Sequence, residues 1–136
     1  MSGGDAFFDT NVIVYLLSAD TAKADRAEDL VAQGGVISVQ VLNEFVAVAS
    51  RKLRMPWSDI HEALNPLRAV CEVVPISIET HDRALHVAER HGLSIYDALI
   101  VSAALLAGCR TLYSEDMQDG QVIDKQLTIR NPFGSA

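Results

Sequence analysis

The sequence predicts an α/β protein in which a parallel sheet is covered by helices on both faces. Short apolar runs that suit buried strands alternate with longer stretches of helical period along almost the whole chain. Parallel strands are joined by crossover helices, so this alternation favours a parallel sheet. With 136 residues, 49% of them hydrophobic, the chain is large enough to bury a core of its own. We therefore expect a single domain over residues 1–136, with flexible ends at 1–4 and 134–136.

The first half of the chain predicts two strands and three helices. The strands are expected at residues 5–8 and 36–38, and the helices at 10–18, 21–35 and 39–53. Thr10 or Asn11 is a suitable cap for the first helix, and Ser38 for the third. Gly34 and Gly35 end the second helix, because glycine readily takes the backbone conformation that closes a helix.

The second half continues the alternation after Pro56. Helices are expected at residues 57–70, 79–92 and 94–108, and strands at 71–77, 110–114 and 126–130. Pro66 lacks the backbone N–H that a helix interior needs, so we expect the first of these helices to be interrupted there. Gly92 and Gly108 close the other two. A polar loop at 115–121 separates the last two strands.

The composition restricts the class of protein. The longest apolar run, residues 98–109, is shorter than the ~20 residues of a membrane-spanning helix, and no basic-then-apolar leader opens the chain. Cys71 and Cys109 lie in apolar contexts without CxxC spacing, which favours buried thiols in a reducing compartment. We therefore expect a cytoplasmic protein without a membrane segment.

Four of the eighteen acidic residues do not lie on polar helix faces. Asp9 follows the first strand, Asp97 is in the first turn of a helix that is apolar nearly all round, and Asp116 comes just after a strand. Glu44 borders the apolar stripe of its helix. In an open parallel sheet, the carboxyl ends of the strands and the amino ends of the following helices share the edge where ligands bind. We therefore expect all four acids to face one site.

Taken singly, these acids have simpler explanations. Asp9 and Asp97 are equally well explained as helix caps, and Asp116 as an exposed residue of an acidic loop. The joint pattern favours a site, because the topology independently brings the four together. Two carboxylates ~5 Å apart repel by roughly 3 kcal/mol at an effective dielectric of about 20, so protons or a cation must accompany them. Oxygen ligands without histidine or cysteine select Mg²⁺ or Mn²⁺ rather than zinc.

Several motifs resemble those of the PIN domain, in particular the VapC-like ribonuclease toxins of type II toxin–antitoxin pairs. They are FFDTNVIVYLL, ISVQVLNEF, LSIYDALIVSAAL, LYSEDMQDGQ and IRNPF, and together they extend over nearly the whole chain. The resemblance implies that the metal-binding catalytic acids are Asp9, Glu44, Asp97 and Asp116.

The same resemblance assigns roles to neighbouring residues. It implies that Asp119 is a further candidate metal ligand, that Ser114 is a small hydroxyl residue supporting the site, and that Thr10 and Asn11 lie beside Asp9. It also implies a Rossmann-like PIN fold with a short parallel sheet of about five strands. As partners it implies a second copy of the chain in a homodimer, an RNA substrate, and a cognate VapB-like antitoxin that occupies the groove and holds the toxin inactive.

The predicted function is therefore a Mg²⁺- or Mn²⁺-dependent endoribonuclease. Metal ions can activate a water molecule and neutralise charge on the phosphoryl group, so no serine or lysine nucleophile is needed. The net charge of −7 opposes long-range attraction of RNA, and we expect weak RNA affinity without metal. Arg51, Lys52 and Arg54 form a basic cluster, which the favourable position of cations near a helix C-terminus explains equally well.

Other functions have weaker support in the sequence. A PIN-type scaffold that binds a partner without cutting RNA is the main alternative, and the intact set of four acids argues against it. A phospho-accepting receiver domain would need paired acids after the first strand and a late lysine, whereas FFDTN supplies one acid and Lys125 lies in a polar loop. A hydrolase of small phosphate esters would need DxD where the chain has DTN. Trp57 and Phe133 are expected to be packing anchors, with an interface role left open for Trp57.

Overall fold

The computed structural model describes residues 5–134, which form six strands, six α-helices and one short 3-10 helix. The strands are β1 (Ala6–Phe8), β2 (Gly35–Ser38), β3 (Cys71–Val74), β4 (Thr111–Tyr113), β5 (Val122–Ile123) and β6 (Leu127–Arg130). The helices are α1 (Thr10–Val14), η1 (Tyr15–Leu17), α2 (Thr21–Ala32), α3 (Val39–Arg51), α4 (Trp57–Val70), α5 (Ile78–His91) and α6 (Ile95–Leu106). The expected flexible ends lie outside the described residues, apart from Gly134.

The strands form one mixed but mostly parallel sheet in the order β3-β2-β1-β4-β6-β5. Only β5, among the described strands, runs antiparallel, paired with β6. Along the chain, β2 is added beside β1 and β3 beside β2, and β4 then pairs with the other side of β1. The sheet therefore has a topological switch point between β1 and β4, which is where ligands bind in folds of this kind.

The predicted fold class is confirmed, with one correction to the strand count. The sheet has six strands rather than about five, because the chain before β6 folds back on it as β5. Asp124 and Lys125 make this reversal with positive φ angles of 52° and 58°, a backbone conformation that tight hairpin turns require. The loop expected at 115–121 is otherwise where the sequence predicted it.

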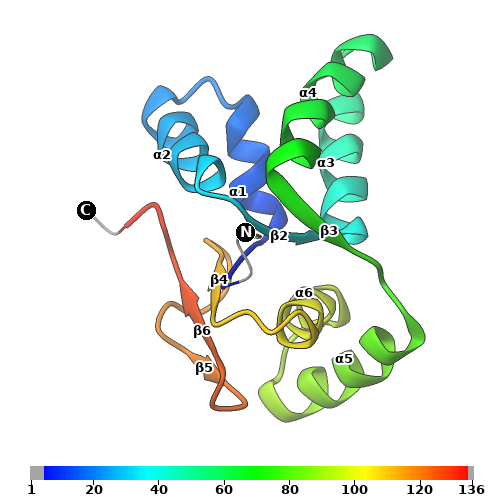
Figure 1. The fold of residues 1–136 in the computed structure, drawn as a ribbon, viewed down its shortest axis with the longest axis vertical. Coiled ribbons are helices and arrows are strands. Elements are labelled where there is room, and N and C mark those ends of the chain that lie inside the picture. The colour runs from blue at the N-terminus through cyan, green and yellow to red at the C-terminus, as the bar shows by residue number, and fades with distance from the viewer. Residues whose placement is uncertain (1–4, 135–136) are drawn as a thin grey trace.

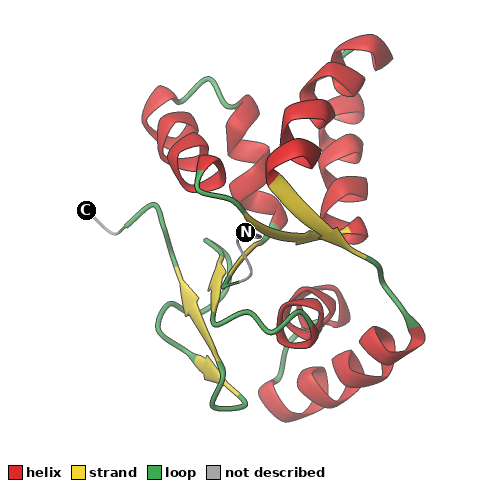
Figure 2. Ribbon diagram, viewed as in Figure 1, coloured by secondary structure: helices red, strands yellow, loops and turns green. Residues whose placement is uncertain are grey.

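Helices cover the sheet on both faces. Figure 1 shows α1 to α4 gathered on one side of the sheet and α5 and α6 on the other. Figure 2 shows β2 and β3 between these two groups, with β4, β5 and β6 beside α6. α6 is the central helix, with seven buried residues along its length, which accounts for its nearly continuous apolar sequence. The core includes Phe7, Ile37 and Leu112, which are fully buried on neighbouring strands. The sheet edge that carries the site therefore rests on a rigid core.

Two predictions about the region around α4 are wrong. The helix continues through Pro66 without interruption. Proline removes the bond to the carbonyl of Glu62, but both residues are exposed, so water can replace the missing donor. Trp57 is 64% exposed and is not a packing anchor. The prediction for Phe133 is confirmed, since its ring packs edge-on against Tyr15 with 4.6 Å between centroids.

Two further observations concern the cysteines and the length of the helices. Cys71 and Cys109 are buried free thiols, as expected. Over residues 5–134, none of the helices combines the length and the apolar character needed to cross a membrane.

Candidate active site

Asp9 lies at the switch point of the sheet, directly after β1. Its backbone N–H donates to the carbonyl of Tyr113 at 3.0 Å, which extends the pairing of β1 with β4 by one residue. Its carboxylate accepts from the N–H of Thr10 and from the hydroxyl of Ser114, both at 2.7 Å. The side chain is only 6% exposed. Asp9 therefore both caps α1 and faces the ends of two adjacent strands.

The loop after β4 brings Asp116 to the same place. Ser114 is fully buried, and its oxygen accepts from the N–H groups of Asp116 at 3.2 Å and Met117 at 3.3 Å while its proton goes to Asp9. The amide nitrogen of Asn11 donates to Asp9 at 3.3 Å and to Asp116 at 3.1 Å. One amide therefore bridges two carboxylates that are 107 positions apart in the chain.

Glu44 and Asp97 approach from two helices. Glu44 on α3 accepts from the hydroxyl of Thr10 and, at 3.4 Å, from the amide of Gln40. The same amide donates to the carbonyl of Tyr96 at 3.2 Å, which ties the start of α3 to the residue before Asp97 on α6. Ser94, rather than Asp97, caps α6, because the Ser94 oxygen accepts from the Asp97 N–H at 3.1 Å. The capping explanation considered for Asp97 is therefore not needed.

The pKa values show that these acids share one electrostatic environment. The pKa of Asp9 is raised to about 6: burial raises it most, the hydrogen bonds from Ser114 and Thr10 lower it, and the charges of Asp97 and Asp116 raise it. The pKa of Asp97 is also raised, first by burial and then by the charges of Asp116 and Glu44. Charge repulsion therefore links Asp9 to Asp97 and Asp116, and it links Asp97 to Asp116 and Glu44.

The donor set fits a hard cation that keeps part of its water shell. Among residues 5–134, no three His, Cys, Asp or Glu side chains are grouped closely enough to enclose a metal ion on their own. The donors on Thr10, Asn11 and Ser114 instead fix the carboxylates of Glu44, Asp116 and Asp9 by hydrogen bonds. Mg²⁺ is usually bound by one or two carboxylates together with several waters, so it does not require a closed protein cage. An all-oxygen set without thiolate or imidazole suits Mg²⁺ or Mn²⁺.

Asp119 occupies a different position. It is exposed, and its carboxylate accepts from the backbone N–H of Asn131 at 2.8 Å, which ties the end of the loop to the segment after β6. The described hydrogen bonds join Asp119 to that segment rather than to the four acids.

Sequence reasoning missed two residues that organise the site. Gln40 connects Glu44 to α6, and its position four residues before Glu44 on one helix could have indicated the contact. Glu115 was treated as part of an acidic loop, although its N–H donates to the side-chain oxygen of Asn11 at 3.1 Å and its carboxylate is bound on both oxygens. Nothing in the local sequence distinguishes Glu115 from its acidic neighbours.

The fold and the site define a class: Rossmann-like α/β domains with an acidic site at the carboxyl ends of the parallel strands. Residues 6–119 match the family model described as "PIN domain". The chain belongs to the PIN-domain family. No curated protein is similar enough in sequence to be recognised as a relative.

Solved structures share this fold at low sequence identity. A toxin–antitoxin complex from Klebsiella pneumoniae superposes with a TM-score of 0.71 at 23% identity, over 94% of this chain and 98% of that one. VapC20 of Mycobacterium tuberculosis, described as a sarcin-ricin loop cleaving toxin, gives a TM-score of 0.68 at 23% identity, over 82% and 90%. VapBC2 from Rickettsia felis, bound to promoter DNA, gives 0.59 at 23% identity, over 82% and 87%. The predicted likeness to VapC-like PIN domains is confirmed at the level of the fold.

Proposed function

We propose that this chain is a divalent-metal-dependent endoribonuclease and the toxin of a toxin–antitoxin pair. The observation that carries the proposal is the grouping of Asp9, Glu44, Asp97 and Asp116 at the switch point, with the pKa of buried Asp9 raised to about 6. The PIN-domain family and the fold shared with VapC20 support the same function. The alternative, a PIN-type scaffold that does not cut RNA, leaves the presence of acids around the buried Asp9 unexplained.

The acids would hold Mg²⁺ or Mn²⁺ and orient it toward the substrate. When bound, the ion supplies an activated water and neutralises the non-bridging oxygens of the phosphodiester. Asp9 must release its proton to act as a ligand, and the donors on Thr10 and Ser114 stabilise the ionised form. We assign Asp97 and Asp116 to the same ion because their charges act on Asp9. Glu44, positioned by Thr10 and Gln40, completes the set.

We propose Asp119 as an outer member of this set. Its bond to Asn131 fixes the end of the loop that carries Asp116, so it acts on the site through loop position, and it would contact the ion only after that bond is exchanged. This makes Asp119 less important for metal binding than the other four acids.

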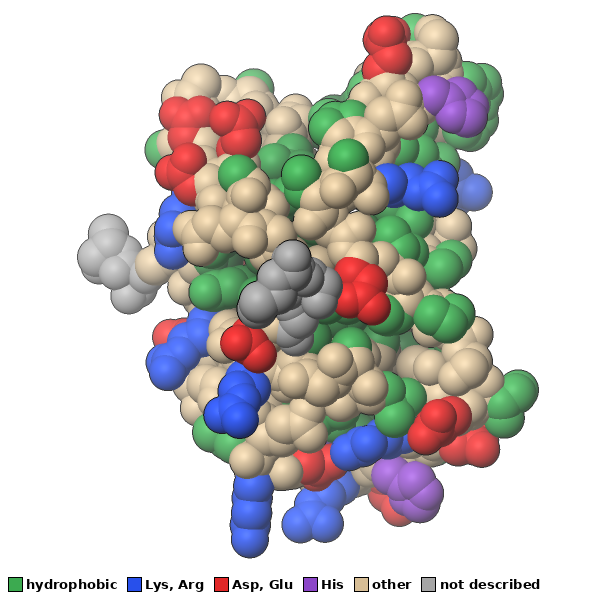
Figure 3. Space-filling model, in the orientation of Figure 1, with side chains coloured by type: hydrophobic (Ala, Val, Ile, Leu, Met, Phe, Trp, Pro, Cys, Tyr) green, Lys and Arg blue, Asp and Glu red, His purple; other side chains and the backbone are tan. Residues whose placement is uncertain are grey.

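The surface charge fits a substrate held mainly through the metal. Figure 3 shows acidic side chains gathered over α2, with Lys and Arg side chains along the margin near β5 and β6 and below α5. Arg51, Lys52 and Arg54 are exposed at and after the end of α3. With a net charge of −7, the protein gains little from long-range attraction of RNA, so binding should depend strongly on bound cations.

A protein partner also has a suitable surface. A mostly apolar groove of about 350 Å³ lies between η1, α2 and α4, and it is lined by Leu16, Leu17, Glu28, Val31, Ala32, Ala63, Pro66, Leu67 and Val70. We propose that the apolar side chains of a VapB-like antitoxin bind there. We also propose a homodimer, since Ile76, Ile78 and Leu85 expose 41%, 78% and 51% of their surface before and along α5.

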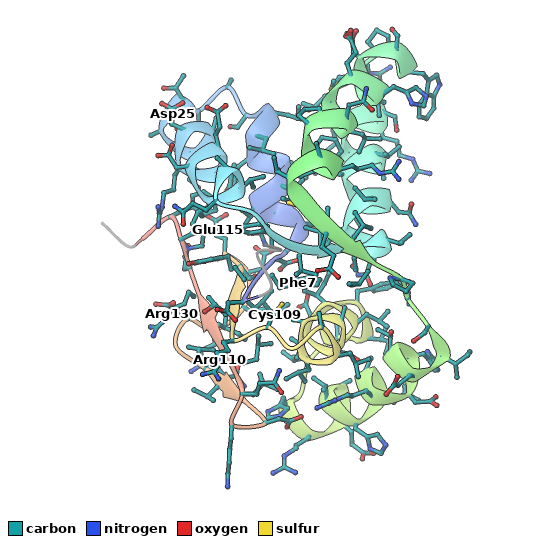
Figure 4. The ribbon with its side chains drawn as sticks, in the orientation of Figure 1. Phe7, Asp25, Cys109, Arg110, Glu115 and Arg130 are labelled. Carbon is teal, nitrogen blue, oxygen red and sulfur yellow. The ribbon has the colours of Figure 1, made fainter. Side chains whose placement is uncertain are left out.

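Cleavage of total RNA by the purified chain tests the proposed function. We expect RNA ends at defined sites in the presence of Mg²⁺, no cleavage in EDTA, and no cleavage by the Asp97→Asn variant. Asp25→Asn is the matched control, because Asp25 is an exposed acid on the outer side of α2 (Figure 4). Full cleavage by Asp97→Asn would reject the assignment of Asp97 to the active site, and metal binding without any cleavage would favour the non-catalytic scaffold.

A further inference from the structure

Three side chains form a closed triangle beside the loop that carries Asp116. The hydroxyl of Tyr15 donates to one carboxylate oxygen of Glu115 at 2.5 Å, and the ammonium group of Lys23 donates to the other at 3.0 Å. The ammonium group also donates to the Tyr15 hydroxyl at 3.0 Å. We call Tyr15, Lys23 and Glu115 the clamp. Figure 4 shows Glu115 directly beneath α2, the helix that carries Lys23.

The clamp acts on the residue next to Asp116. Asn11 and Tyr15 are four residues apart along α1 and η1, so they lie on the same side of this segment. Asn11 accepts from the N–H of Glu115 and donates to the carboxylate of Asp116, both at 3.1 Å. Tyr15 holds the Glu115 side chain at the same time. The backbone and the side chain of Glu115 are therefore both fixed by one short segment of the chain.

The position of Lys23 is unusual for a cation. It lies in the first turn of α2, where Asp20 caps its N–H and where the helix dipole disfavours positive charge. Its ammonium group is 4.6 Å from the centroid of the Tyr15 ring and 5.7 Å from that of Phe133. Two aromatic faces and Glu115 offset the unfavourable dipole. These contacts come from separate parts of the chain, so they define where the ammonium group lies.

Pairing with Lys23 also offsets the negative charge that Glu115 places beside the site. Without a partner, Glu115 would place a further negative charge beside Asp116, where Asp9 and Asp97 already repel it. An unpaired carboxylate would push the loop away from the site or compete for the ion. In the clamp its charge is matched and both of its oxygens are occupied.

We propose that Tyr15, Lys23 and Glu115 position the Asp116 carboxylate for the metal, an inference that rests on the proposed function. The clamp residues are positioning residues and do not bind the ion themselves. Groups that orient metal ligands typically change metal affinity or activity by about 10–100-fold when removed. A purely structural role for Lys23 would be to hold the C-terminal segment against α2. Arg26 on the same helix already makes such a contact, because it donates to the carbonyl of Pro132 at 2.8 Å.

The test compares full-length variants substituted at two positions of the same helix, α2. Lys23→Met removes the ion pair, Lys23→Arg restores the charge, and Arg26→Met is the matched control that leaves the Asp116 loop untouched. We expect Lys23→Met to weaken Mn²⁺ binding by about tenfold in calorimetry, and Arg26→Met to change it by less than about twofold. Backbone amide hydrogen exchange at residues 115–117, measured without metal, should accelerate only in Lys23→Met. RNA cleavage by Lys23→Met should recover at high Mn²⁺.

The possible outcomes separate the clamp from the proposed function. If Lys23→Met and Arg26→Met both match the wild type in Mn²⁺ affinity and in amide exchange at residues 115–117, the positioning role of the clamp is refuted. RNA cleavage by the wild type would in that case still support the endoribonuclease function. A wild type that neither binds Mn²⁺ nor cleaves RNA overturns the proposed function, and the positioning role with it. If Lys23→Met does not fold, Tyr15→Phe removes only the hydroxyl contact and decides the same comparison.

Discussion

Replacing Asp9 with asparagine should stabilise the metal-free protein at neutral pH. The pKa of Asp9 is raised from 3.8 to about 6, chiefly by burial. Because a raised pKa means that the ionised form is disfavoured in the folded state, this shift corresponds to about 3 kcal/mol of destabilisation once Asp9 is fully ionised. The penalty is absent below about pH 4, grows as the pH rises, and is complete above about pH 6. Asparagine does not titrate and avoids it.

The net gain is smaller than the full penalty. Asp9 accepts from Ser114, Thr10 and Asn11, and an amide oxygen replaces only one of the two carboxylate oxygens. Losing one such acceptor costs about 1 kcal/mol. We therefore expect a gain of about 1–2 kcal/mol in the free energy of unfolding at pH 7.5. For a domain of this size, that gain raises the melting temperature by about 3–8 °C.

Thermal unfolding followed by circular dichroism in EDTA measures this gain. The control Asp25→Asn, at an exposed position on α2, should change stability by less than about 0.5 kcal/mol. At about pH 4 the advantage of Asp9→Asn should disappear. Mn²⁺ should make the wild type more stable than Asp9→Asn, because a ligand at 100 times its Kd stabilises the protein that binds it by about 2.7 kcal/mol. A folded Asp9→Asn variant that is no more stable than the wild type at pH 7.5 in EDTA would refute the electrostatic reasoning.

Three further predictions concern the Ser114 hydroxyl, the pH dependence of cleavage and the packing of Gly35. Ser114→Ala removes a donor to Asp9 and should lower Mn²⁺ affinity by about tenfold in calorimetry; unchanged affinity would show that this hydroxyl does not orient the ligand. At subsaturating Mg²⁺, RNA cleavage should rise with pH as Asp9, whose pKa is about 6 without metal, ionises and binds the ion, and it should then level off; a flat profile from pH 4 to 7 would contradict the raised pKa. Gly35→Ala places a Cβ 2.5 Å from the Phe8 ring, so chemical denaturation should show a loss of about 1–3 kcal/mol, and wild-type stability would contradict this packing.

Much of the architecture could be predicted because local signals and topology agree. Ser38 and Ser77 cap α3 and α5, and Gly92 closes α5 in the left-handed conformation, so these helix ends are encoded by a few adjacent residues. The proximity of Asp9 and Asp116 could also be predicted, because they follow the paired strands β1 and β4, and parallel strands place their carboxyl ends at one edge.

The failures have a common physical cause, since each depends on contacts or solvent exposure that the local sequence does not specify. Pro66 was expected to interrupt α4, but an exposed helix face tolerates the missing hydrogen bond. Trp57 was expected to be packed, but apolar character alone does not determine burial. Glu115 acquires its contacts only when Tyr15 and Lys23, 100 and 92 positions away, are brought beside it by folding.

Anomalous diffraction from crystals grown with Mn²⁺ would locate the metal among these acids. We expect a Mn²⁺ peak at the switch point between β1 and β4, about 2.0–2.3 Å from carboxylate oxygens that include those of Asp9. The same peak should be absent from crystals of the Asp9→Asn variant. A wild-type crystal at saturating Mn²⁺ without a peak between these acids, or with its peak at another part of the surface, would show that they do not form the metal site.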